Sequence, residues 1–198
     1  QLTRAMTKKK APRKDVSKAY NTFKTAAIRP SGNGFTGAPI IAPDELNRQK
    51  GEISLNDLED MLSGFAYDAC YNHSAQSMKN YFLVWDYAIN QGFAFGSGMG
   101  TNHHYGYQIR KIYTTAWLMR DAIWKAPNRD NILSALIFWS ALQETRIPYQ
   151  YGRDELLDSW HTLLMPKTIS ALMFVDERER ARALTGLSRW LSGSLQYS

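Results

Sequence analysis

The sequence predicts an all-α fold built from antiparallel helical hairpins, and three observations support this prediction. Apolar residues recur every three or four positions over most of the 198-residue chain, as they do along one face of a helix. Glycine and proline mark short joints between these periodic segments. The sequence lacks any useful length of the alternating apolar and polar residues that mark a half-buried strand. We therefore expect roughly seven or eight helices stacked in pairs.

The first predicted helix opens at Pro12, because proline suits a first helical turn. Its apolar face consists of Val16, Ala19, Tyr20, Phe23 and Ala27. Prolines and glycines then interrupt the pattern from Arg29 to Gly51, which predicts a long loop. Loops of this length are uncommon in compact domains and are often functional.

Two further helices follow the loop. Ser54 and Asp57 have the spacing of a capping box, which predicts a helix start. The apolar face of that helix consists of Leu55, Leu58, Leu62, Phe65 and Ala69. Gly92 is a natural stop for the next helix. The apolar face of this second helix consists of Met78, Phe82, Trp85 and Ile89.

A third long helix is expected after a glycine-rich segment at 92–104. Its buried face is predicted to consist of Ile109, Ile112, Ala116, Met119 and Ile123. Pro127 and Asn128 break and restart the chain. Later helices are expected to about Arg146 before Pro148, from Asp154, from Pro166 and from Glu177.

Composition favours an anionic partner. The net charge is +6 and the pI is near 9.4, which fits nucleic acid, an anionic membrane surface or acidic polysaccharide. Basic residues gather between Lys8 and Lys14, where a solvated helix start is a simpler interpretation than a nucleic-acid-binding arm. The aromatic content of 13% suits a thick core, and it also suits a cleft in which rings stack on sugars. No apolar run approaches the ~20 residues of a membrane span.

The single Cys70 excludes an internal disulfide framework, and its apolar neighbours predict a small core residue. The chain opens on glutamine, so we expect a processed or excised piece of a larger protein. The lack of a leader therefore does not argue for the cytoplasm.

The segment from Gly96 to His104 holds the most informative candidates. Its glycines precede a helix, so backbone N–H groups there can meet an anion, and a flexible joint is the alternative. His103 and His104 are adjacent and point in different directions, and no cysteine or carboxylate completes a zinc set, so no metal site is predicted. One histidine beside Tyr105, Tyr107 and Arg110 suits proton transfer, with a structural histidine as the alternative.

Three stretches of sequence resemble one known family. The central stretch runs from Asn90 to Ala122 and includes Thr-Asn-His-His-Tyr-Gly-Tyr-Gln-Ile-Arg at 101–110. The others are the early loop, with Asn33-Gly34 to Gly37 and Pro43-Asp44, and the segment 154–164 with Leu-Asp-Ser-Trp-His-Thr-Leu. Together they resemble the chondroitin sulfate ABC lyases of polysaccharide lyase family eight, over nearly the whole chain.

The resemblance implies an incomplete α/α toroid, of which residues 1–198 would be a single helical domain at the N-terminal side. It also implies β-elimination: a base takes the C5 proton of a uronic acid and the 4-linked oxygen leaves. His104 would serve as an auxiliary base for iduronate, with His103 as the second choice. No cofactor or metal is implied for this chain. The predicted substrate contacts are Asn33, Asn102, Tyr105, Tyr107, Arg110 and Trp160, the last with a core position as its alternative.

The chain departs from the family in lacking the segment with the principal catalytic histidine and tyrosine. The flanking β domains are missing as well, so we expect catalysis to need the remainder of the enzyme, as another chain or a missing segment. The implied substrates are chondroitin sulfate, dermatan sulfate and, as a third candidate, hyaluronan, with a secreted or periplasmic location. One alternative is a non-catalytic helical module that binds acidic polysaccharide. A nucleic-acid-binding protein rests only on Lys8 to Lys14, and we expect neither a nucleic-acid partner nor a membrane span.

Overall fold

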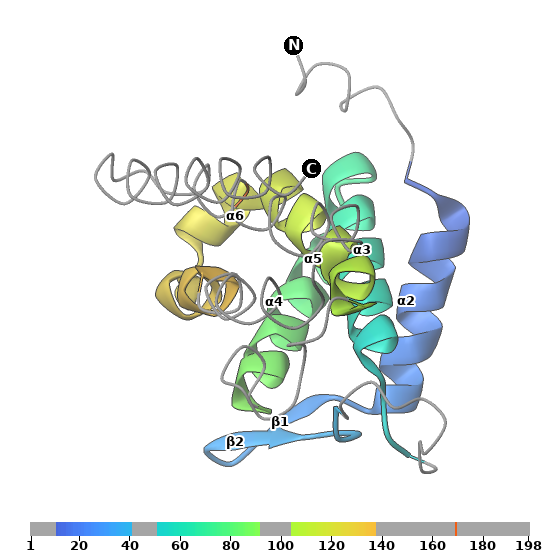
Figure 1. The fold of residues 1–198 in the computed structure, drawn as a ribbon, viewed down its shortest axis with the longest axis vertical. Helices are drawn as coiled ribbons and strands as arrows, with labels where there is room; N and C mark the ends of the chain where they lie inside the picture. Colours follow the sequence, from blue (N-terminus) through green and yellow to red (C-terminus); the bar gives the residue numbers. More distant parts are fainter. Residues whose placement is uncertain (1–10, 41–50, 92–103, 138–168, 170–198) are drawn as a thin grey trace, which may run out of the picture. The chain divides into compact units, whose positions relative to one another are not determined.

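The computed structural model describes residues 11–40, 51–91, 104–137 and 169. The chain divides into two compact units, residues 1–91 and residues 92–198. The described part of the first unit comprises three helices and a β-hairpin: α2 (Arg13–Ala26), β1 (Arg29–Ser31), β2 (Gly34–Thr36), α3 (Leu55–Tyr71) and α4 (Ala75–Asn90) (Figure 1). The second unit contains α5 (His104–Leu118), α6 (Arg120–Lys125) and a further helical stretch at 129–137. The predicted all-α class is confirmed, while the toroid and the single-domain assignment stay predictions.

Helices α2 and α3 pack at very short range, because Gly64 on α3 faces α2. A Cβ atom at this position would lie 2.5 Å from both the Ala19 Cβ and the Asp15 carbonyl oxygen, so only glycine fits. Beside this contact, the ring of Phe65 meets Tyr20 and Phe23 edge-on, with centroids 5.1 and 5.4 Å apart. The α2–α3 interface therefore combines a close approach of the two helix backbones with aromatic packing.

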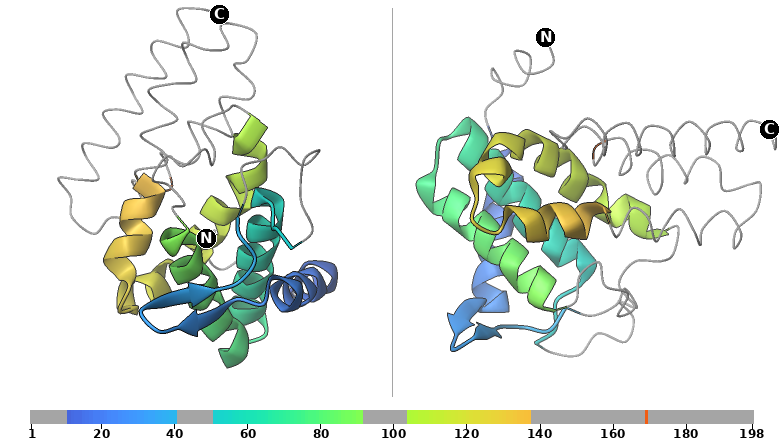
Figure 2. Two further views of the ribbon diagram at one scale, coloured as in Figure 1. Left: turned by 90° about the horizontal axis from the view of Figure 1, so that it is seen from below. Right: turned by 90° about the vertical axis from the view of Figure 1, so that its left-hand side faces the viewer.

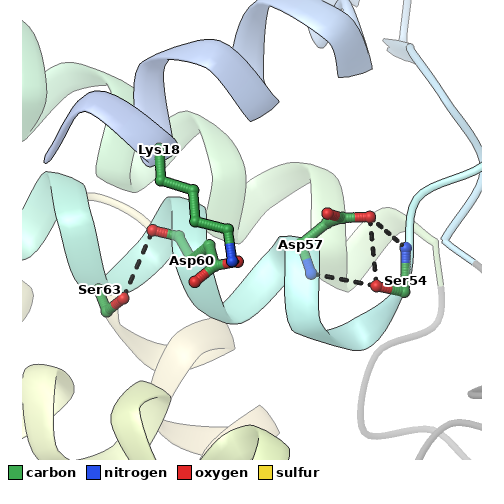
Figure 3. Close-up of polar contacts among 5 residues, drawn as sticks. All are labelled: Lys18, Ser54, Asp57, Asp60 and Ser63. Carbon is green, nitrogen blue, oxygen red and sulfur yellow. Dashed lines mark hydrogen bonds and ion pairs between the residues drawn. The ribbon is translucent and has the colours of Figure 1, made fainter. Parts of the chain in front are cut away.

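The predicted capping box at the start of α3 is confirmed (Figure 3). The Ser54 side chain accepts a hydrogen bond from the Asp57 amide at 3.2 Å, and the Asp57 carboxylate accepts one from the Ser54 amide at 2.9 Å. One turn later, Asp60 pairs with Lys18 of α2 at 2.6 Å, which adds an ion pair to the α2–α3 interface (Figure 3). Local sequence and tertiary packing thus agree over this part of the chain.

The buried face of α4 differs from the predicted one. Trp85 is fully buried as expected, but Met78, Phe82 and Ile89 are only partly buried. The residues that do face the core are Ser77, Asn80, Tyr81, Val84, Trp85, Tyr87 and Ala88. The face is rotated because two polar residues, Ser77 and Asn80, are buried and accommodated by hydrogen bonds to Asp68 and Gln76.

The region expected to be a long loop contains the β-hairpin (Figure 2). Arg29 pairs with Thr36 and Ser31 pairs with Gly34, so the turn consists of Gly32 and Asn33. Gly32 has φ 56°, as the first central residue of a type II′ turn requires. The hairpin attaches to α4, because the Tyr87 hydroxyl donates to the Ala38 carbonyl and the Phe35 ring meets the Tyr87 ring at 6.2 Å.

Of the other local predictions, some are confirmed and some are wrong. Ala27 is not on the apolar face of α2 but is its exposed left-handed C-cap, with φ 51°. Cys70 is only partly buried. The predicted buried stripe of the third long helix is confirmed at Ile112, Ala116, Met119 and Ile123, although the helix is interrupted at Met119. No described helix is long and apolar enough to cross a membrane.

Candidate functional site

Four of the predicted site residues share one helix. His104 is the first residue of α5, and Tyr105, Tyr107 and Arg110 follow within its first two turns. Asn33 lies elsewhere, exposed at the hairpin turn of the first unit. The predictions for Asn102, His103 and Trp160 fall outside the described residues.

The helical register separates these four positions. Positions 104, 107 and 110 are spaced by three residues, so each is a neighbour of the next on successive turns of the helix. Position 105 precedes Ile112 by seven residues, in register with the buried stripe of α5. The register thus favours His104, Tyr107 and Arg110 over Tyr105 as a shared surface for a ligand.

Interior contacts hold α5 in place behind this face. Ile112, Tyr113, Thr115 and Ala116 are all buried. The Tyr113 hydroxyl donates to the Leu136 carbonyl at 2.5 Å, which ties α5 to the helical stretch at 129–137. A buried carbonyl satisfied in this way fixes the rotation of α5 about its own axis, and that rotation decides which residues face outward.

Two tryptophan–arginine pairs lie on the surface of the second unit, and the sequence analysis did not single them out. The Arg120 guanidinium carbon lies 4.5 Å from the centre of the Trp117 ring, and that of Arg129 lies 5.1 Å from the Trp124 ring. All four side chains are partly exposed. The only sequence signal for the first pair is its i, i+3 spacing, whereas the second pair spans the turn at Pro127 and depends on the fold.

A buried polar cluster joins the three helices of the first unit. Ser77 donates to the Asp68 carboxylate at 2.5 Å, and the Tyr20 hydroxyl lies 2.7 Å from the same Ser77 oxygen. Asn72 also donates to Asp68, at 2.7 Å. Burial alone would raise the pKa of Asp68, but the hydrogen bonds from Ser77, Asn72 and Ser74 outweigh it and lower that pKa. A carboxylate with a lowered pKa is a weak base, so this cluster suits a structural role rather than proton transfer.

Within the residues that the structure describes, no three His, Cys, Asp or Glu side chains gather as metal ligands. The described part of α5 carries imidazole, phenol and guanidinium groups. Such a set can move a proton and neutralise a carboxylate.

Comparison with known proteins gives a consistent result. The family model described as "Lyase, catalytic" matches residues 1–198. A chondroitin sulfate ABC exolyase of Bacteroides thetaiotaomicron is 32% identical over 119 residues, which is 59% of this chain and 11% of the relative. A chondroitin sulfate ABC endolyase of Proteus vulgaris is 24% identical over 200 residues, covering 91% of this chain and 20% of the relative.

A chondroitin sulfate ABC exolyase of Proteus vulgaris is also similar, at 28% identity over 159 residues, 74% of this chain and 16% of the relative. The chain thus spans between 11% and 20% of the length of these relatives.

Proposed function

The chain belongs to the lyase catalytic-domain family, and from this premise we propose that it forms part of the helical catalytic domain of a glycosaminoglycan lyase. The observation that supports the proposal most strongly is the family match over all 198 residues. The relatives are named as chondroitin sulfate ABC lyases, so chondroitin sulfate and dermatan sulfate are the substrates proposed for the complete enzyme.

The reaction is a β-elimination at a uronic acid. A base removes the C5 proton, the electrons form a double bond between C4 and C5, and the 4-linked oxygen leaves with a proton from an acid. Developing charge on the uronate carboxyl group needs a cation beside it, since this charge opposes removal of the proton. In this scheme His104 is an auxiliary base, Arg110 is the cation and Tyr107 contacts the sugar.

The position of His104 supports this role. Histidine is the side chain best suited to exchange a proton near neutral pH, and His104 begins α5 one turn before Tyr107, which in turn precedes Arg110 by one turn. The remaining acid and base come from parts of the enzyme beyond these 198 residues, as the small share of the relatives' length suggests. A secreted or periplasmic location fits a polymeric substrate that is too large to enter a cell.

The test uses the full-length enzyme and follows the ultraviolet absorbance of the unsaturated uronate product. His104→Ala should reduce dermatan sulfate cleavage by about a hundredfold, a typical loss for a general base, and chondroitin sulfate cleavage much less. His103→Ala is made in parallel, because His103 is the second choice for this base, and a larger loss of dermatan sulfate cleavage there would assign the base to His103 instead. Equal losses on both substrates would remove the epimer-specific role of His104. A full-length enzyme that forms no unsaturated product from either polymer would refute the lyase proposal.

A second candidate function is a non-catalytic module that binds acidic polysaccharide. The net charge of +6 and the two tryptophan–arginine pairs favour it. Binding of chondroitin sulfate by a full-length protein that releases no product would select this second function.

A further inference from the structure

The α5–α6 segment displays aromatic and cationic side chains along one face. Arg120 lies over Trp117 and Arg129 lies over Trp124, and Arg120 and Trp124 are four residues apart on α6, so they share its face. We propose that these four residues, the Trp–Arg face, form an accessory binding surface for acidic polysaccharide. This inference rests on the proposed function, and it assigns a polymer-binding role to residues downstream of His104.

A turn at Met119 separates α5 from α6. Met119 has φ −90° and ψ 5°, and the backbone N–H groups of Ala122 and Ile123 both donate to its carbonyl at 2.9 Å. Buried Met119 and Ile123 hold the adjoining face against the interior of the unit.

The start of the Trp–Arg face lies in register with Arg110, the cation of the proposed reaction. Arg110 precedes Trp117 by seven residues within α5, so these two positions recur at nearly the same angle on that helix. A linear polymer in contact with Arg110 would therefore meet Trp117 further along the same helix. Two separate cation–aromatic pairs match a polymer with repeating charges better than they match a small anion.

The two arginines are held in place and still accessible. The Arg120 guanidinium stacks on Trp117 and donates from Nη1 to the Trp117 carbonyl at 3.0 Å, while its side chain is 26% exposed. The Arg129 side chain is 43% exposed above Trp124. A cation fixed by an aromatic ring loses less freedom when it binds a sulfate or carboxylate group.

Neighbouring carboxylates do not neutralise these cations fully. The Nε atom of Arg120 lies 3.9 Å from the Asp121 carboxylate, and the Nε atom of Arg129 lies 2.9 Å from that of Asp130. The two aspartate side chains are 83% and 82% exposed, so water screens both pairs and each contributes little. An anionic polymer can displace them, while the partly exposed indole rings offer apolar surface to the C–H groups of its sugars.

The experiment measures binding of a chondroitin sulfate oligosaccharide to the 198-residue chain by isothermal titration at fixed salt. The double variant Arg120→Gln with Arg129→Gln should weaken binding by about tenfold, because two charge-assisted contacts are lost. The matched control is Lys24→Gln with Lys125→Gln, which removes the same charge from exposed side chains and should weaken binding less than about threefold. Equal losses in the two double variants would overturn the proposal, because net charge alone would then explain binding.

Further variants guard against misfolding as an explanation. Replacing both arginines with lysine keeps the charges and should restore part of the affinity. Asp121→Asn with Asp130→Asn should tighten binding by about threefold, because competing carboxylates are removed. Unchanged or weaker binding in this aspartate variant would mean that the ion pairs serve only structure, and it would overturn the proposal.

Two comparisons separate this inference from its alternatives. Single-stranded DNA that binds as tightly as the oligosaccharide at matched salt would reject the polysaccharide assignment. Arginine-dependent binding by this chain, together with a full-length enzyme that makes no unsaturated product, would reject the lyase proposal alone. A working lyase whose arginine variants bind normally would reject the accessory surface alone.

Discussion

The interior of the first unit and the Trp–Arg face of the second unit use charged groups in opposite ways. In the first unit, Asp68 is buried, and its carboxylate accepts hydrogen bonds from Ser77 and Asn72 inside the protein. In the second unit, Arg120 and Arg129 lie on tryptophan rings and remain exposed. Buried hydrogen-bonded charges specify how helices pack, whereas held but solvated charges are available to a ligand. The comparison predicts large stability effects in the first unit and small ones on the Trp–Arg face.

The largest effect is expected at the α2–α3 crossing. Gly64→Ala would place a methyl group 2.5 Å from the Ala19 Cβ and the Asp15 carbonyl, so the helices must separate. We expect a loss of about 3 kcal/mol in the free energy of unfolding, the upper end for overpacking. Urea denaturation measures it. Adding Ala19→Gly should recover part of the loss, since it removes one of the two clashes, and wild-type stability in Gly64→Ala itself would refute the close approach.

An intermediate effect is expected at Asp68. Asp68→Asn keeps the shape of the side chain but removes the negative charge to which Ser77 and Asn72 donate hydrogen bonds. The free energy of unfolding should fall by about 1.5 kcal/mol at neutral pH. Because the pKa of Asp68 is lower when folded, its contribution is complete above the unfolded pKa and disappears as the pH falls through the folded pKa. The difference in melting temperature between wild type and variant should therefore shrink below about pH 4. A difference that is constant down to pH 2 would contradict this linkage.

The smallest effect is expected on the Trp–Arg face. Arg120→Gln should change the free energy of unfolding by less than about 1 kcal/mol, because exposed cation–π contacts and surface ion pairs contribute little. Thermal melts of this variant beside Gly64→Ala would show the contrast directly. A loss at Arg120 as large as that at Gly64 would mean that the guanidinium is part of the packing, and the contrast between the two regions would fail.

Sequence patterns predicted the features that depend on near neighbours. The capping box of Ser54 and Asp57 involves residues three positions apart, and both hydrogen bonds are present. The buried stripe from Ile112 to Ile123 was also correct, because it follows from helical periodicity alone. The hairpin at 29–36 was missed, because its three-residue strands are too short to show alternation.

The rotated face of α4 shows why other features were not predictable. Hydropathy places Ser77 and Asn80 outside, but hydrogen bonds with Asp68 and Gln76 make their burial acceptable. A hydropathy pattern does not contain these hydrogen bonds, and the partner of Ser77, Asp68, lies on another helix. At the candidate site, the sequence pointed to a helix after residue 104 and to candidates that include His104, Tyr105, Tyr107 and Arg110, and the structure gave the bounds of that helix.

The sequence by itself determined the helical class, the family and the candidate residues at the start of α5, because these depend on periodicity and on short local motifs. Tertiary structure alone decided that α2 approaches α3 at Gly64, that Asp68 is satisfied in the interior, and that Arg129 lies on Trp124 across the turn at Pro127. The physical reason is that burial and contact depend on the atoms that surround a residue in space, and a one-dimensional pattern contains these only for neighbours within a turn or two of the chain.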